Sequence, residues 1–96
     1  MNIEMEKHNM IRVLILKILC PEYPKAVDAV LLRRCLADFS YPQSEKSLKS
    51  YLAYLSEIGC IRVDEKKDYD ITMVTITAKG MDILDGRSIE PGIKFD

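Results

Sequence analysis

Residues 48–84 read LKSYLAYLSEIGCIRVDEKKDYDITMVTITAKGMDIL, and the periodicity of this stretch indicates the fold class. Apolar residues first recur at helical spacing, which predicts a helix that begins after the N-cap Ser44 and ends at Gly59. Next, CIRVD and ITMVTIT alternate and are rich in β-branched side chains, which predicts an antiparallel hairpin joined by EKKDYD. Thr77 then caps a short helix, AKGMDILD, which Gly80 weakens and Gly86 closes.

Two helices are expected before this stretch. The run MIRVLILKIL at residues 10–19 contains eight apolar side chains, and Pro21 stops it, so we expect a first helix from about Glu4 to Cys20. Apolar residues at helical spacing in AVDAVLLRRCLADF predict a second helix from about Ala26 to Asp38. Three helices, a hairpin and a short helix make an α+β domain.

Length and composition indicate one globular unit. The chain has 96 residues, 48% hydrophobic and 30% charged, which predicts a single domain over residues 1–96, with residues 87–96 as an irregular tail. Without a long apolar run, and with acids in MNIEMEKHNM, the protein is expected to be cytoplasmic and not bound to a membrane. Three cysteines without a CxxC pair predict reduced thiols and no metal site.

Net charge limits the kind of partner that the chain attracts. There are 14 Lys+Arg and 15 Asp+Glu residues, so the formal net charge is −1 at pH 7. The overall field of such a protein does not attract a polyanion. Binding to a nucleic acid would therefore depend on a local patch of cations.

The stretch LKSYLAYLSEIGCIRVD, followed by ITMVTITAKGMDIL, resembles winged helix-turn-helix regulators of the broad MarR and PadR kind. The shared pattern is a recognition helix ending in L-x-x-x-G-x-I, one wing, and a strand running into I-T-x-x-G; it covers about Ala26 to Leu84. The small size and LDGRSIEPGI are similar to short winged-helix proteins of Mu-like phages and prophages. The resemblance implies a three-helix bundle with a β-hairpin wing and a short C-terminal helix, and it implies a homodimeric transcriptional regulator that binds double-stranded DNA.

The third helix carries the expected DNA contacts. Its apolar side chains fall within an arc of roughly 120°, and the opposite face is small, polar and cationic at its start. A helix that enters the major groove needs short side chains and hydrogen-bonding groups on that face. The expected contacts on this helix are Ser44, Lys46, Ser47, Lys49, Ser50, Ala53 and Tyr54. The alternative is the ordinary solvated side of an amphipathic helix.

Cations outside the third helix are expected to bind the DNA backbone. Arg33 and Arg34 of the second helix would lie near phosphates, and Lys66 and Lys67 would lie at the wing tip. Residues 60–76 contain three cations and four anions, however, so a merely soluble hairpin tip is an equal alternative. Within this hairpin we expect Tyr69 to pack at the base; the alternative is that it stacks on or intercalates between bases.

A second apolar stripe on the first helix predicts a homodimer. The stripe contains Val13, Leu16 and Cys20, and Met10 extends it. Apolar groups of the last segment are expected to join this interface, namely Ile89, Ile93 and Phe95. The alternative is that the C-terminal segment of the same chain covers the stripe.

Catalysis and cofactor binding find little support in the sequence. His8 is the only histidine and has no nucleophile or carboxylate spaced as a partner, and the four glycines form no phosphate-binding loop. We therefore expect no enzyme and no cofactor. The leading hypothesis is a DNA-binding transcriptional regulator. The alternative is a winged-helix adaptor that binds a phage or host protein within a phage nucleoprotein assembly, without direct DNA contact.

Overall fold

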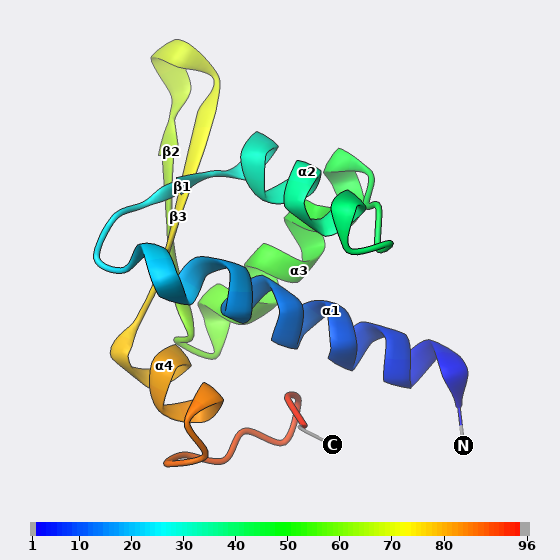
Figure 1. The fold of residues 1–96 in the computed structure, drawn as a ribbon. Coiled ribbons are helices and arrows are strands. Elements are labelled where there is room, and N and C mark those ends of the chain that lie inside the picture. Colours follow the sequence, from blue (N-terminus) through cyan, green and yellow to red (C-terminus); the bar gives the residue numbers. More distant parts are fainter. Residues whose placement is uncertain (1, 95–96) are drawn as a thin grey trace.

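The computed structural model describes residues 2–94, which form four α-helices and a three-stranded antiparallel sheet of order β1-β3-β2 (Figure 1). The expected α+β class is therefore confirmed. In chain order the elements are α1 (Ile3–Leu19), β1 (Val27–Asp28), α2 (Ala29–Asp38), α3 (Glu45–Glu57), β2 (Ile61–Lys66), β3 (Ile71–Ile76) and α4 (Ala78–Leu84).

Helices α1 and α3 have the bounds that the sequence predicts, to within about two residues. The side chain of Asn2 caps α1 by accepting a hydrogen bond from the Glu4 amide at 2.9 Å. The Ser44 hydroxyl caps α3 by accepting from the Ser47 amide at 3.0 Å. Both caps satisfy amides that the first turn of a helix otherwise leaves without partners.

The start of α2 differs from the sequence prediction. Residues Val27 and Asp28 form the short strand β1, in which Val27 lies opposite Val74 of β3. The Asp28 carboxylate then accepts a hydrogen bond from the Val30 amide at 2.8 Å and so caps the helix. Helix α2 therefore begins at Ala29 rather than at Ala26, because pairing with β3 holds the preceding residues extended.

The predicted hairpin is present and is longer than expected. Strands β2 and β3 pair from Ile61 opposite Ile76 to Lys66 opposite Ile71. Most of EKKDYD is thus paired or turns tightly, and Asp70 completes the connection with a positive φ of 53°. The hairpin projects away from the helices as a long arm (Figure 1).

Gly80 lies at a position of α4 where the neighbouring residues of the hairpin leave no room for a Cβ atom. A Cβ at this position would lie 2.5 Å from the carbonyl oxygen of Cys60 and 2.8 Å from Cγ1 of Ile76. Thr77 caps the helix as predicted, since its hydroxyl accepts from the Gly80 amide at 3.2 Å. Gly80 therefore sets how closely α4 packs on the start of the hairpin.

The core lies between the three larger helices and the sheet, and α4 and the last segment close it from below (Figure 1). The Asn9 side chain holds the last segment on α1, since its amide donates to the Lys94 carbonyl and accepts from the Lys94 amide. The largest fully buried side chains are Ile11, Ile15, Leu16, Leu19, Leu32, Leu36, Leu55, Val74, Ile76 and Ile83.

The stripe predicted for a dimer interface is partly covered within one chain. Val13 is 9% exposed and Leu16 is 0% exposed, because α2, β3 and α4 all contact α1 and Ile93 is buried beside them. The prediction that Val13 and Leu16 form a dimer interface is therefore wrong. Met10 keeps 50% of its surface exposed and Cys20 is half-buried, so a role for these two stays a prediction. Ile89 is exposed, and Phe95 lies outside the described residues.

Candidate nucleic-acid interface

The outward side of α3 is exposed to solvent from the cap to Ala53. Leu48, Leu52 and Leu55 face the core, which leaves the opposite side of the helix to solvent. Five of the predicted contact residues are exposed on it: Ser44, Lys46, Lys49, Ser50 and Ala53. Within residues 2–94 neither lysine forms an ion pair. Both ammonium groups are available to a ligand.

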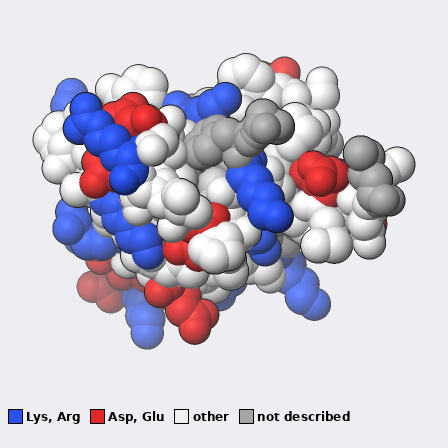
Figure 2. Space-filling view, turned by 90° about the horizontal axis from the view of Figure 1, so that it is seen from below, with Lys and Arg blue, Asp and Glu red and all other residues white. Residues whose placement is uncertain are grey.

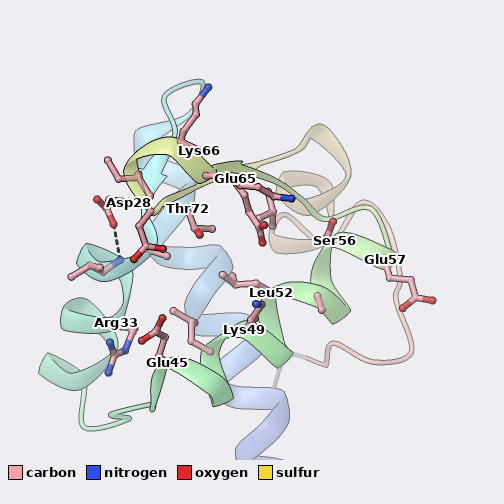
Figure 3. Close-up of a pocket in the computed structure, with 18 residues that line it drawn as sticks. Asp28, Arg33, Glu45, Lys49, Leu52, Ser56, Glu57, Glu65, Lys66 and Thr72 are labelled. Atoms are coloured by element: carbon pink, nitrogen blue, oxygen red, sulfur yellow. Dashed lines mark hydrogen bonds between the residues drawn. The ribbon is translucent and has the colours of Figure 1, made fainter.

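A groove of about 790 Å³ separates α3 from α2 and the hairpin (Figure 3). Its floor contains Leu48, Leu52 and Val63. Four cations and five anions line it, namely Arg33, Lys49, Lys66 and Lys67, and Asp28, Glu45, Glu57, Glu65 and Asp70. A lining of both signs lacks the single-sign field that attracts a phosphate backbone. Sequence reasoning missed this groove, because the hairpin and α3 meet only in the folded chain.

Tyr54 lies on a different side of α3 from the exposed lysines. The Arg12 guanidinium lies 4.0 Å from the centre of the Tyr54 ring and donates to the Gly92 carbonyl at 3.0 Å. A Cβ at Gly92 would overlap the Tyr54 hydroxyl. Because the ring packs between α1 and the last segment, Tyr54 is removed from the predicted DNA contacts.

Two other predicted contacts hold the α2–α3 connection. The Ser47 hydroxyl donates to Oε1 of Gln43 at 2.6 Å, and Nε of Arg33 donates to the Gln43 carbonyl at 3.2 Å. Both side chains are half-buried. Their hydrogen bonds fix the entry of the chain into α3, so they orient the exposed face of this helix. Arg34, the neighbour of Arg33, is exposed.

The hairpin tip offers fewer free cations than its sequence suggests. Nζ of Lys66 lies 3.0 Å from the carboxylate of Asp64, and this exposed pair neutralises one of the two tip lysines. Lys67 is exposed and has no ion pair among the residues described. Tyr69 is 77% exposed at the tip, so the expectation that it packs at the base of the hairpin is wrong.

Polar side chains of α1 and α3 contact each other on the opposite side of α3 from the groove's hairpin wall. Nδ1 of His8 lies 2.6 Å from the Tyr51 hydroxyl. Burial raises the pKa of Tyr51, while the charge of Arg12 lowers it. Among the described residues no cluster of three or more His, Cys, Asp or Glu side chains is placed to hold a metal ion.

The face formed by α4 and the end of the chain mixes lysine and arginine with acidic side chains, and neither sign dominates it (Figure 2). In the part of the chain that the structure describes, no helix has the length and apolar character required to cross a bilayer.

Comparison with family models, curated proteins and solved structures found no match for this chain.

Proposed function

We propose that this chain is a winged-helix protein that binds double-stranded DNA by placing the first half of α3 in the major groove. The observation that carries this proposal is that Lys46 and Lys49 are exposed on the outward side of a capped helix and form no ion pair with any residue that the structure describes. Lysine contributes charge toward phosphates and donors toward base edges. The side chains of Ser50 and Ala53, which lie beyond these lysines along the helix, are short enough for close approach.

The dimensions of α3 suit such a contact. Helical rise is about 1.5 Å per residue, so Lys46 to Ala53 spans roughly 10 Å, or about three base pairs. The amides near Ser44 form the positive end of the helix and favour a nearby phosphate. Exposed Arg34 and Lys67 provide two further cations for the backbone.

The charge available to one chain sets the expected strength of binding. Lys46, Lys49, Arg34 and Lys67 give about three to four phosphate contacts, hence a salt slope near −3. Selective control of transcription in the cytoplasm would then be expected to use two copies. The interface of such a homodimer does not include Val13 or Leu16, because the chain buries them itself.

The groove favours a second candidate function. Its mixed lining and apolar floor suit a protein segment better than a phosphate backbone, and the exposed Tyr69 at the tip is a typical protein-contact residue. A winged-helix adaptor in a phage nucleoprotein assembly would bind its phage or host partner there.

Fluorescence anisotropy with a random 20-bp duplex tests the first proposal at about 50 and 200 mM salt. Three to four phosphate contacts give a slope of about −2.7 to −3.6, which predicts affinity weaker by about 40- to 150-fold at the higher salt. Reversing both charges, Lys46→Glu with Lys49→Glu, is expected to abolish binding. The matched control is Lys7→Glu with Lys17→Glu on exposed positions of α1, which makes the same change in net charge.

The control variant is expected to keep most of the affinity. Equal losses in the two variants would mean that only net charge matters and would contradict a contact at α3. No binding at the lower salt would refute the DNA proposal and leave the adaptor as the function that the groove supports.

A further inference from the structure

The side chains on the outward face of α3 can recognise only some bases. From Lys46 to Ala53 this face presents two ammonium groups, one hydroxyl and one methyl group, and the exposed carboxylate of Glu45 lies in the first turn, four residues before Lys49. An ammonium group only donates hydrogen bonds, and guanine O6 and N7 are the paired acceptors of the major groove. A methyl group contacts the C5 methyl of thymine.

Adenine has no bidentate partner on this face. Bidentate recognition of adenine uses the amide of asparagine or glutamine, and the chain has three such residues. Asn2 caps α1, and Asn9 is occupied by the backbone of Lys94. Gln43 donates to the Tyr41 carbonyl and accepts from Ser47. Each amide is therefore engaged within the fold, and none lies on the outward face of α3.

The two base contacts fall close together. Lys46 lies in the first turn near Ser44, where the helix N-terminus favours a phosphate, whereas Lys49 lies nearly one turn further along. Lys49 and Ala53 are four residues apart, which places them about 6 Å apart along the helix axis, or about two base steps.

We infer that the site selects a guanine, read by Lys49, and a thymine about two base steps away, read by Ala53, and that it makes no bidentate contact with adenine. This specificity rests on the proposed DNA binding. It assigns Lys49 and Ala53 as specificity-determining residues and Lys46 as a phosphate contact.

The test starts from 20-bp duplexes selected from a random pool by the wild-type chain. In these duplexes guanine is replaced by 7-deazaguanine, which lacks the N7 acceptor, or thymine by uracil, which lacks the methyl group. Replacing adenine by 7-deazaadenine is the control. Because 7-deazaguanine removes one of the two acceptors, we expect it to weaken binding by about 2-fold to 13-fold, half of the free energy of a bidentate contact. We expect uracil to weaken it about 4-fold, as for one buried methyl group, and 7-deazaadenine to leave it unchanged.

Two variants connect each effect to its side chain. Lys49→Met keeps a long, helix-favouring side chain and is expected to remove the response to 7-deazaguanine while keeping the response to uracil. Ala53→Ser is expected to do the reverse. Circular dichroism checks that both variants fold.

The outcomes separate the two proposals. Absence of binding to any duplex at about 50 mM salt overturns DNA binding and the specificity together. Salt-dependent binding that ignores both analogues, or that weakens with 7-deazaadenine, overturns the specificity alone. An analogue response that survives in both variants also overturns the assignment to Lys49 and Ala53.

Discussion

Replacing Gly80 by alanine tests the packing of α4 against the sheet. In an open helix this substitution stabilises by about 1 kcal/mol, because alanine loses less backbone entropy than glycine on folding. At this position the new Cβ would lie 2.5 Å from the Cys60 carbonyl oxygen. That oxygen cannot move freely, since it accepts a hydrogen bond from the Thr77 amide at 3.0 Å.

The expected magnitude follows from these opposing effects. Overpacking typically costs about 1–3 kcal/mol, and weakening the hydrogen bond to Cys60 costs about 1 kcal/mol more. After the gain in helix propensity, Gly80→Ala is expected to lower the free energy of unfolding by about 1–3 kcal/mol. For a domain of this size that corresponds to a fall in Tm of at least about 4 °C.

Urea denaturation followed by circular dichroism measures this change. The control is Ala37→Gly at an exposed position of α2, which reports helix propensity without overlap and is expected to cost about 1 kcal/mol. If Gly80→Ala proved as stable as the wild-type chain or more so, the close approach of α4 to Cys60 would be refuted.

Three further predictions concern other contacts. Ser44→Ala removes the hydrogen bond to the Ser47 amide and is expected to cost about 0.5–2 kcal/mol in urea denaturation; no loss would contradict the cap. Burial raises the pKa of Tyr51 in the folded chain above its value of about 10 in the unfolded chain. The protonated Tyr51 side chain therefore makes its full contribution to the free energy of unfolding below about pH 10, and this contribution is lost as the pH rises through the folded-state pKa. Above pH 10 the unfolding free energy of the wild-type chain should therefore fall more steeply than that of Tyr51→Phe; parallel curves would contradict this. Asn9→Ala should speed amide hydrogen exchange at Lys94 at least several-fold by NMR, and an unchanged rate would show that Asn9 does not hold the last segment.

Local signals predict most of the elements of this fold. The cap at Ser44, the change from helical to alternating periodicity after Gly59 and the cap at Thr77 each depend on neighbouring residues. The structure confirms these features with small shifts at the ends. Strand β1 was missed, because two residues are too few to establish a period and their extended form depends on pairing with β3.

The candidate site is predictable only in part. Exposure of Lys46, Lys49 and Ser50 follows from the helical period and is confirmed. The position of Tyr54 does not follow, because it borders the exposed arc and the residues that cover it, Arg12 and Gly92, come from opposite ends of the chain. The groove likewise depends on how the hairpin lies beside α3. The spacing of residues within a single helix or strand does not predict this arrangement.

The Tyr54 ring also bears on mutagenesis along α3. Its hydroxyl lies against the backbone of Gly92, and its face lies under Arg12, which holds the same backbone. A truncated side chain there would leave a void that loosens the chain terminus from the first helix. Impaired DNA binding by a Tyr54 variant would thus result from a structural defect at the contact of α3 with α1 and the last segment. An alanine scan of α3 therefore needs a stability measurement of the Tyr54 variant before a loss of binding is assigned to a lost DNA contact.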